Sequence, residues 1–321
     1  MIPVISLNDK NIVDKMYNAY STIGFAVFTD VYDNWILEFK DWFQLAEEFF
    51  ALPSETKLKY SYSGVAENIG YGCVGQESLT PNMPGDLKET FNWSNPPYMS
   101  EEYWPVEIAD FRALAENIHR ISRLVSYKFL ANFEKALKLS AGTLVEKHLD
   151  NVDILRINHY PADLRATEEN QIRGGSHTDY DTITLLYIIN DVGGLQVFDR
   201  VADQWIDAPI IENSVIVNIA DMFQRWTNDT FLSTPHRVVN NDMTRARYTM
   251  PHFVTPRRDV VVTNLMNDKS KYDPISAYDY LQWRLSKSYV DDEYKEKTQT
   301  KQKGLSHLLS LCFLLIFIVY I

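Results

Sequence analysis

The sequence is poor in cysteine, and this scarcity limits the kinds of protein that it can encode. Only Cys73 and Cys312 occur among 321 residues, far apart and in unlike surroundings. Two such cysteines cannot build a disulfide framework or a zinc site made of cysteines. The composition therefore argues against a disulfide-held secreted scaffold and a cysteine-based zinc domain, and we expect a reducing compartment.

Positive charge is also scarce. Lys and Arg number 31 against 43 Asp and Glu, so the formal net charge is −12. An acidic surface repels phosphate backbones, and no basic run interleaved with aromatic residues offsets it, so we expect no nucleic-acid partner. Hydrophobic residues make up 45% of the chain, which predicts a folded globular protein and not a disordered one.

The beginning of the chain lacks the cationic and apolar stretches of a secretory leader. The other end differs, because residues 304–321 carry no formal charge apart from a proton on His307 and are almost wholly apolar from Leu308 onward. As a helix they would extend roughly 27 Å, close to the thickness of a bilayer's hydrocarbon core. A polar spacer with lysines, residues 291–303, precedes them in the manner of a cytosolic flank. We expect a C-terminal membrane anchor with the body in the cytoplasm; the alternative is a buried or partner-facing helix.

The rest of the chain is not divided by internal repeats or a Gly/Ser-rich linker, so a single domain is predicted over 1–290. Apolar residues at helical spacing predict a mostly helical part over 1–150. Within it, Gly and Pro crowd residues 64–97 and predict a long ordered loop. Short alternating segments over 151–265 favour a jelly roll or barrel over a parallel sheet. A closing helix is predicted at 276–289.

Alternation is clearest in the strand expected at 154–160. There Ile154, Arg156, Asn158 and Tyr160 face one way, while the residues between them face the other. Further short strands are expected at 182–189, 195–198, 205–208, 214–219, 236–240, 247–254 and 259–263.

A candidate metal site begins at His177 and Asp179. Residues two apart in an extended segment project to the same side, so this imidazole and this carboxylate can converge on one ion. His236, at the head of an expected strand, can supply a second imidazole. Two histidines and one carboxylate on one face of an octahedron leave three positions open, which is the arrangement of non-haem Fe(II) oxygenases.

The His-x-Asp pattern is weak evidence alone, so the other histidines have to be weighed against it. His119 and His148 lie on expected helices among charges and are interpreted as solvated. His159 and His252 lie in expected strands and are interpreted as pocket or core residues.

Arg247 and Thr249 follow His236 on the next expected strand. An Arg fork with a hydroxyl two places away suits a carboxylate held at a distance from a metal. An arginine on a solvent-facing edge is the alternative for Arg247 alone. This alternative is weaker than carboxylate binding if Arg247, Thr249 and Tyr160 all face the same barrel interior.

Several segments occur together in one order along the chain. They are Ile2-Pro3-Val4-Ile5, Gly24-Phe25, Phe49-Phe50-Ala51-Leu52-Pro53, Gly70-Tyr71-Gly72, Lys88-Glu89-Thr90-Phe91-Asn92, His177-Thr178-Asp179, Gly193-Gly194-Leu195-Gln196-Val197, Gln224-Arg225-Trp226-Thr227-Asn228, Ser233-Thr234-Pro235-His236-Arg237-Val238-Val239 and Arg247-Tyr248-Thr249-Met250-Pro251. In these motifs the chain resembles the isopenicillin N synthase-like branch of the 2-oxoglutarate/Fe(II)-dependent dioxygenases, over nearly all of its length to about residue 285.

The resemblance implies roles for individual residues. The metal ligands of the family fall on His177, Asp179 and His236. Its Arg-x-Ser pair, which grips the distal carboxylate of 2-oxoglutarate, falls on Arg247 and Thr249, where Thr keeps the hydroxyl. Its Asn-x-Tyr signature, which helps to hold the co-substrate, falls on Asn158 and Tyr160. The implied fold is mainly β with flanking helices, a double-stranded β-helix or distorted jelly roll.

Two features depart from the family pattern. The usual Gly-Asp turn ahead of the second histidine reads Ala220-Asp221, which removes no ligand. The apolar tail has no counterpart.

By resemblance, the function is that of a non-haem Fe(II) dioxygenase that couples oxidative decarboxylation of 2-oxoglutarate to hydroxylation or desaturation of a small organic substrate. It would consume O2, with ascorbate as a supporting reductant. The alternatives are a 2-oxoglutarate-independent Fe(II) oxidase of the isopenicillin N synthase or aminocyclopropane carboxylate oxidase type, and a non-catalytic jelly-roll binding module. The candidate substrate-pocket residues are Tyr71, Phe91, Tyr180, Phe223 and Phe253, although an aromatic residue of this kind is more often plain core than a substrate contact.

Overall fold

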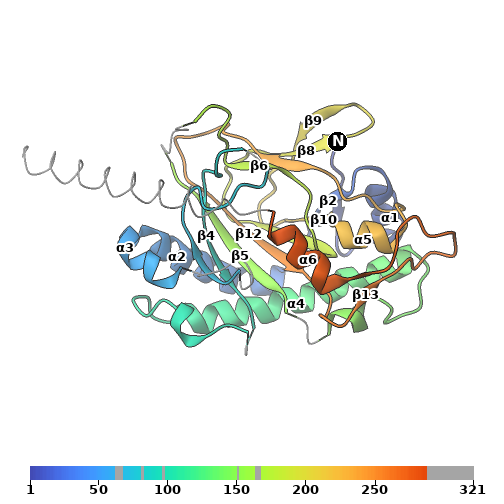
Figure 1. Cartoon of the computed structure of the whole chain (residues 1–321), viewed down its shortest axis with the longest axis horizontal. Helices are drawn as coiled ribbons and strands as arrows, with labels where there is room; N and C mark the ends of the chain where they lie inside the picture. Colours follow the sequence, from blue (N-terminus) through green and yellow to red (C-terminus); the bar gives the residue numbers. More distant parts are fainter. Residues whose placement is uncertain (62–67, 81–82, 96–97, 150–151, 163–167, 288–321) are drawn as a thin grey trace, which may run out of the picture.

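Two β-sheets form the centre of the computed structural model, which describes residues 1–287 except 62–67, 81–82, 96–97, 150–151 and 163–167 (Figure 1). The larger sheet contains, in spatial order, β1 (Val4–Ser6), β2 (Phe25–Thr29), β10 (Val215–Ile219), β7 (Ile183–Ile188), β12 (Arg247–Val254), β5 (Ile154–Tyr160), β4 (Glu89–Trp93) and β3 (Gly70–Gly72). The smaller sheet contains β6 (Gly174–His177), β11 (His236–Val238), β8 (Leu195–Asp199) and β9 (Gln204–Asp207). A separate pair joins β13 (Val261–Val262) to β14 (Ile275–Ser276).

Strand pairing in both sheets is antiparallel except between β1 and β2. Strands that follow one another along the chain often lie in different sheets: β7, β10 and β12 belong to the larger sheet, and β6, β8, β9 and β11 belong to the smaller one. This is the double-stranded β-helix that the sequence predicts.

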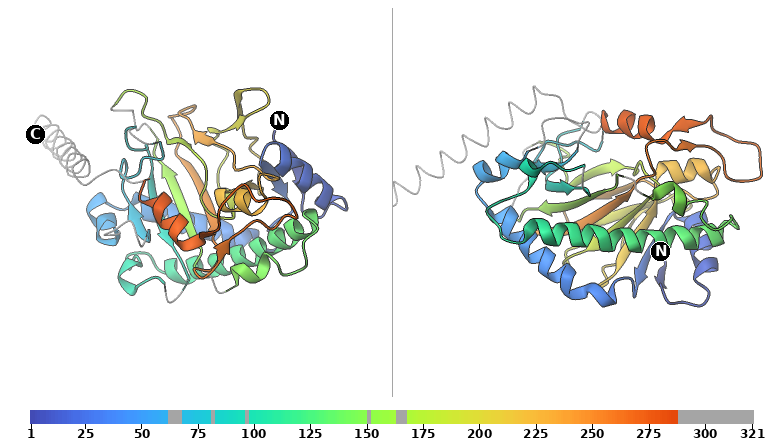
Figure 2. Two further views of the ribbon diagram at one scale, coloured as in Figure 1. Left: turned by 45° about the vertical axis from the view of Figure 1, so that its right-hand side comes forward. Right: turned by 90° about the horizontal axis from the view of Figure 1, so that it is seen from below.

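Helices flank the sheets. They are α1 (Ile12–Thr22), α2 (Ile36–Ala51), α3 (Ser54–Lys57), α4 (Phe111–Ala136), α5 (Asp221–Trp226) and α6 (Ala277–Leu285), with 3-10 turns η1 (Asp33–Trp35), η2 (Leu58–Tyr60), η3 (Glu101–Tyr103) and η4 (Val145–His148). Figure 2 shows α2 and α4 running side by side across the outer face of the larger sheet, while α5 and α6 lie apart from them. In α4 an apolar stripe that includes Phe111, Ile118, Val125 and Phe129 is buried in the main core. Burying each large apolar side chain contributes about 1.5–3 kcal/mol, which holds this long helix in place.

A second apolar cluster lies between the two sheets. It contains Phe25 and Val27 from β2, Tyr160 from β5, and Val197 and Val238 from the smaller sheet. This cluster ties the sheets together on the inside, and a cavity occupies the remaining space beside it.

One local prediction needs correction. Residues 64–97 are not simply a loop, because β3 and β4 within them extend the large sheet beyond β5. Strand β4 pairs with β5, which lies more than sixty residues further along the chain. The Gly and Pro content of the segment itself indicated only a loop. A strand that depends on so distant a partner leaves little signal in its own composition.

The C-terminal predictions are only partly covered by the structure. Helix α6 begins where predicted, with the Ser276 hydroxyl accepting a hydrogen bond from the Asp279 N–H. The last two residues of the predicted 276–289 helix, the spacer 291–303 and the apolar segment 304–321 lie outside the described residues. No helix within the described ranges has the length and apolar character needed to cross a membrane.

Candidate active site

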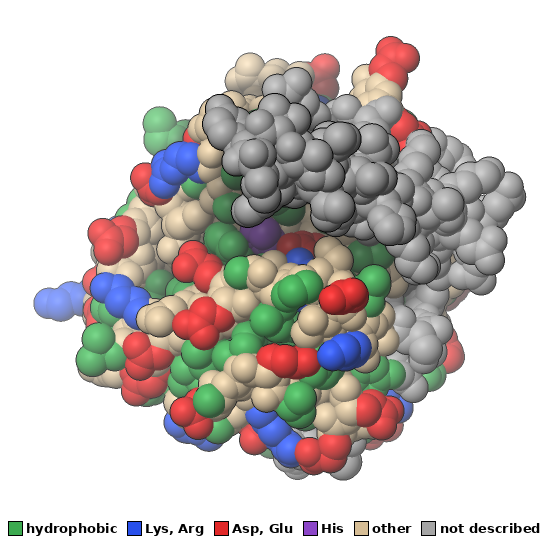
Figure 3. All heavy atoms as spheres, turned by 90° about the vertical axis from the view of Figure 1, so that its left-hand side faces the viewer, with side chains coloured by type: hydrophobic (Ala, Val, Ile, Leu, Met, Phe, Trp, Pro, Cys, Tyr) green, Lys and Arg blue, Asp and Glu red, His purple; other side chains and the backbone are tan. Residues whose placement is uncertain are grey.

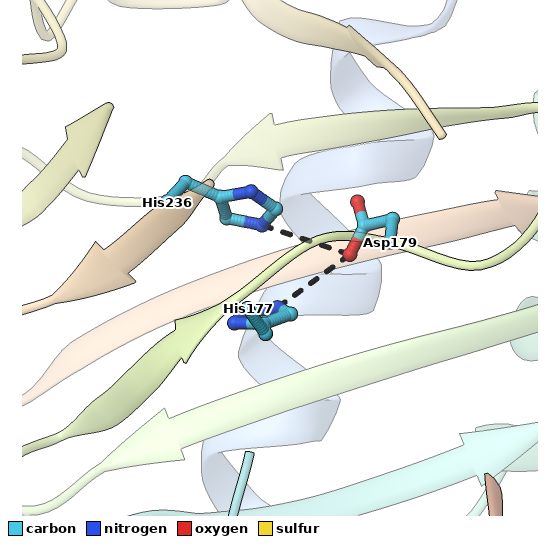
Figure 4. Close-up of side chains that lie close together, drawn as sticks. All are labelled: His177, Asp179 and His236. Atoms are coloured by element: carbon cyan, nitrogen blue, oxygen red, sulfur yellow. Dashed lines mark ion pairs between the residues drawn. The ribbon is translucent and has the colours of Figure 1, made fainter. Parts of the chain in front are cut away.

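Two neighbouring strands and the loop after one of them bring together the three side chains predicted to bind metal. His177 ends β6 and pairs directly with His236, which begins β11. Asp179 follows β6 by two residues, and its Oδ1 lies 3.5 Å from His177 Nε2 and 3.6 Å from His236 Nε2. The three side chains point toward one another (Figure 4), and their ligand atoms all lie within 4.8 Å. Among the described residues no second cluster of this kind occurs.

Backbone carbonyls orient both imidazole rings. His177 Nδ1 donates to the Gly175 carbonyl oxygen at 2.8 Å, and His236 Nδ1 donates to the Thr234 carbonyl oxygen at 3.2 Å. A carbonyl oxygen can only accept, so each Nδ1 carries the proton and each Nε2 presents its lone pair to Asp179. This is the tautomer that a metal-binding histidine requires.

The carboxylate is fixed from its other side. Asp179 Oδ2 accepts hydrogen bonds from Thr184 Oγ1 at 2.6 Å and from Asn218 Nδ2 at 2.8 Å. Thr184 belongs to β7 and Asn218 to β10 in the larger sheet, so both sheets contribute to the same cluster. Oδ1 is left facing the two imidazoles.

The charge states of these groups suit a cation. Burial, reinforced by the nearby His177, lowers the pKa of His236 to about 4, so this ring is neutral near pH 7. Burial opposes ionisation of Asp179, and the hydrogen bonds that its Oδ2 accepts from Thr184 and Asn218 favour the carboxylate form. Three acceptor atoms therefore face one another without a donor between them. A divalent cation removes this repulsion, and a set of two nitrogens and one oxygen with open positions fits Fe(II).

A second group of predicted residues lies on β12 and β5, whose register pairs Arg247 with Tyr160 and Thr249 with Asn158. Arg247 and Thr249 are each 2% exposed. The Asn158 amide donates to Thr249 Oγ1 at 3.4 Å, and the Arg247 guanidinium lies 4.9 Å from the centre of the Tyr160 ring. We call these four residues the clamp.

The clamp contains polar atoms without partners. Arg247 Nε donates to the Val192 carbonyl oxygen at 3.2 Å, but Arg247 Nη1 and Asn158 Oδ1 form no hydrogen bond. In the described part of the chain no Asp or Glu pairs with Arg247. A buried guanidinium without a counter-charge is costly, and an anionic ligand would compensate it.

One cavity connects the metal cluster with the clamp, since all seven of these residues line it. Figure 3 looks onto a hollow in the surface where a histidine, basic and acidic side chains are visible. Helix α6 adds Leu281 and Leu285 to the wall. Its Arg284 anchors it by donating to Asp221 Oδ2 at 2.6 Å and by lying 4.1 Å from the centre of the Tyr180 ring.

The same cavity has a charged wall that sequence reasoning missed. Arg156 donates two hydrogen bonds of 2.8 Å to the Glu77 carboxylate, from Nη1 to Oε2 and from Nη2 to Oε1. Lys88 Nζ lies 3.3 Å from Glu77 Oε2 and 2.6 Å from Asp86 Oδ2. Asp86 Oδ1 in turn accepts from the Gly175 N–H at 2.9 Å, next to the metal cluster. The alternation on β5 already placed Arg156 on the same face as Asn158, which was the available signal.

The predicted aromatic pocket residues divide into two groups. Tyr180 and Phe253 line the cavity. Tyr71, Phe91 and Phe223 do not, which corrects the prediction. Phe91 and Phe223 are 0% exposed and pack on other rings of the main core, and the Tyr71 hydroxyl donates to Glu89 Oε2.

The four other histidines that the structure describes are all part of the packed interior. His119 and His148 are 2% and 0% exposed, so their interpretation as solvated residues was wrong. His148 donates to the Leu144 carbonyl oxygen and accepts from Thr182 Oγ1, which satisfies both ring nitrogens. His252 is also fully buried, and His159 is largely so, as expected for residues of the pocket or core.

Comparison with known proteins gives the family. The profile described as the 2OG-Fe(II) oxygenase superfamily matches residues 151–256, and that described as the non-haem dioxygenase in morphine synthesis N-terminal matches residues 2–110. The chain belongs to the 2OG-Fe(II) oxygenase superfamily. It is therefore an Fe(II)- and 2-oxoglutarate-dependent dioxygenase that uses O2, and the alternative of a 2-oxoglutarate-independent oxidase is not favoured.

Relatives of this oxygenase cover most of its length. Proline hydroxylase buaE of Petromyces alliaceus is 33% identical over 310 residues, which cover 86% of this chain and 93% of the relative. A full-length Neurospora crassa protein, solved as a crystal structure in complex with alpha-KG, which is 2-oxoglutarate, is 28% identical with a TM-score of 0.78, and the match covers 89% of this chain and 96% of that one. The structure of JOX2 with 2OG, Fe and JA is 23% identical with a TM-score of 0.79, covers 92% of this chain and 88% of its own, and shares the fold.

Proposed function

We propose that this oxygenase holds Fe(II) with His177, Asp179 and His236. The observation that carries the proposal is the cluster of three acceptor atoms that face one another, each oriented by neighbours and none supplied with a donor. When bound, the iron, 2-oxoglutarate and O2 supply the oxidising chemistry, with 2-oxoglutarate converted to succinate and CO2.

We further propose that the clamp binds the distal carboxylate of 2-oxoglutarate. Arg247 would pair with this carboxylate through its guanidinium, whose Nη1 has no hydrogen-bond partner, while Thr249 offers a hydroxyl beside it. Burial makes the charge-assisted hydrogen bond strong, because little water competes for either group. Tyr160 supports the guanidinium with its ring face.

The substrate is proposed to be a small organic molecule with polar groups. The cavity offers aromatic side chains, among them Tyr180 and Phe253, and the charged wall of Arg156 and Glu77. Similar proteins support a small substrate, since one is named a proline hydroxylase and the Neurospora crassa protein also has a structure with thymine, at 27% identity. The residues of this wall would orient one carbon of the substrate toward the iron, for hydroxylation or desaturation.

The test uses the full chain with Fe(II), ascorbate and labelled 2-oxoglutarate against a metabolite extract. We expect succinate, together with a product heavier by one oxygen or lighter by two hydrogens. The His177→Ala variant is expected to lose iron binding and both products. Unchanged iron binding in that variant would contradict the ligand assignment, and product without stoichiometric succinate would point to the oxidase alternative.

For the apolar segment 304–321 we propose membrane anchoring with the catalytic body facing the cytosol. Its lack of formal charge and the preceding lysines support this proposal. Fractionation of cells that express the full chain or a chain ending at Gln302 tests it. Only the full chain should sediment with membranes, and identical partitioning of the two would refute the anchor.

A further inference from the structure

A second buried arginine lies behind the clamp. Arg173 comes directly before β6 and is 0% exposed. Its Nη2 donates to the carbonyl oxygens of Pro161 and Arg245, at 3.4 Å and 3.1 Å. Its Nε and Nη1 form no hydrogen bond. Part of this guanidinium is therefore desolvated without compensation, which requires an explanation.

Arg173 and Arg247 approach the same aromatic ring. Their guanidinium carbons lie 6.0 Å and 4.9 Å from the centre of the Tyr160 ring. Burial lowers the pKa of both arginines, and the nearby Arg247 lowers the pKa of Arg173 further. Asp242 acts on Arg173 only through space, and no carboxylate among the described residues forms an ion pair with either arginine. Two buried like charges beside one ring are a site prepared for an anion.

The contacts of Arg173 also support the ends of both clamp strands. Pro161 directly follows Tyr160, and Arg245 precedes Arg247 by two residues. The Arg173 N–H donates to Asn240 Oδ1 at 3.0 Å, which connects it to the loop after β11. One residue thus connects β5, β12 and the segment that leads into the metal-binding strand. Only Arg247 of the two arginines lines the cavity, so Arg173 acts from behind.

We propose that Arg173 is a positioning residue for the co-substrate: it braces Tyr160 and Arg247 and places a second positive charge behind them, which makes the site select a dicarboxylate 2-oxoacid over a monocarboxylate. This inference rests on the proposed assignment of the clamp. Loss of Arg173 should weaken the binding of a dicarboxylate more than that of a monocarboxylate, because a ligand without the distal carboxylate gains nothing from the second charge.

The experiment measures the dissociation constants of 2-oxoglutarate and 2-oxopentanoate, which has a methyl group in place of the distal carboxylate. Calorimetric titrations use the full chain loaded with Fe(II) without oxygen, so no turnover is involved. We expect Arg173→Gln to weaken 2-oxoglutarate about tenfold, as for the loss of one charge-assisted interaction, and 2-oxopentanoate by less than about twofold. Arg173→Lys keeps the charge and should weaken 2-oxoglutarate only about threefold.

Arg225→Gln is the matched control. Arg225 also lies over a tyrosine, 4.6 Å from the centre of the Tyr272 ring, and its Nη2 donates to the Asp273 carbonyl oxygen at 2.9 Å, but it belongs to α5 and not to the clamp. This variant should leave the affinity for both ligands unchanged. Equal weakening of both ligands by Arg173→Gln, or no weakening of 2-oxoglutarate, would overturn the proposal.

Arg247→Gln separates the two proposals. If it leaves 2-oxoglutarate binding intact, the clamp assignment itself fails; if it weakens binding while Arg173→Gln does not, only the inference about Arg173 fails. Should Arg173→Gln not fold, Arg173→Lys decides. Retained preference for 2-oxoglutarate over 2-oxopentanoate supports the role of the charge, and loss of that preference refutes it.

Discussion

The two polar parts of the cavity differ in how their charges are balanced. In the charged wall, Arg156, Lys88, Glu77 and Asp86 satisfy one another with short contacts. In the metal cluster and the clamp, acceptors face acceptors and Arg247 has no acidic partner in the described part of the chain. The wall is complete within the protein, whereas the other part is completed by ligands. We therefore expect changes in the wall to affect stability first and changes in the metal cluster or the clamp to affect binding and activity.

The strongest test of this difference is His177→Ala. Removing a ligand should reduce iron binding and succinate formation by more than about 100-fold, beyond the loss seen when an outer partner of a ligand is removed. The melting temperature of the metal-free chain should stay the same or rise, because one of three opposed acceptors is gone. Thermal melts with a chelator and iron assays measure both, and a large loss of stability would break the comparison.

The opposite behaviour is expected of Glu77→Gln. This change leaves Arg156 and Lys88 buried without their shared counter-charge, at a cost of about 3–5 kcal/mol in the free energy of unfolding. Urea unfolding of the metal-free chain measures it. Glu101→Gln is the control, because Glu101 pairs with Arg112 at the surface, where solvent screens the pair, and its loss should change the free energy of unfolding little. Similar effects of the two variants would mean that the wall is not a buried network.

A smaller effect is expected from Asn218→Leu, which removes one of the two donors that hold Asp179 Oδ2. Iron affinity should fall about 10- to 100-fold, as is typical for the loss of an outer partner of a metal ligand. Thr184→Val should act in the same way, and the double variant should lose less than the sum because both donors serve one oxygen. Competition with a chromophoric chelator gives the affinities. Strict additivity would contradict a shared role.

The mildest test is the pH dependence of stability. Burial opposes ionisation of Glu77, but attraction by Arg156 and Lys88 prevails and lowers its pKa to about 2 from an ordinary 4.5. The unfolded chain then binds more protons than the folded chain between these values, so the stabilisation is complete above about pH 4.5 and is lost as the pH falls toward 2. Between pH 6 and pH 3 the free energy of unfolding should therefore fall less steeply in Glu77→Gln than in the original chain. Unfolding experiments at a series of pH values in this range measure it. Identical slopes would show that Glu77 is not ionised in the wall.

Several features could be predicted from the sequence because they depend on local geometry. Alternation along residues 154–160 placed Arg156, Asn158 and Tyr160 on one face, and all three line the cavity. Arg247 and Thr249, two apart on β12, likewise face this interior. Backbone period determines side-chain direction within a few residues, so no tertiary information is needed for this step.

Other features were out of reach because they depend on pairing between distant segments. Glu77 lies in a stretch whose Gly and Pro content predicted only a loop, and its partner Arg156 is 79 positions away. The aromatic residues Phe91 and Phe223 looked like pocket walls, yet each packs on rings from a helix far along the chain. Hydrophobicity predicts that a ring is buried, but not against which surface.

By itself, the sequence determined which donor atoms this oxygenase has and which side of each strand they occupy, since composition and backbone period are local properties. Only the tertiary structure decided that His177 meets His236 across β6 and β11, and that Arg173 lies behind Tyr160. Those contacts exist because strands remote in sequence are hydrogen-bonded in one register, and a register is a property of the whole sheet.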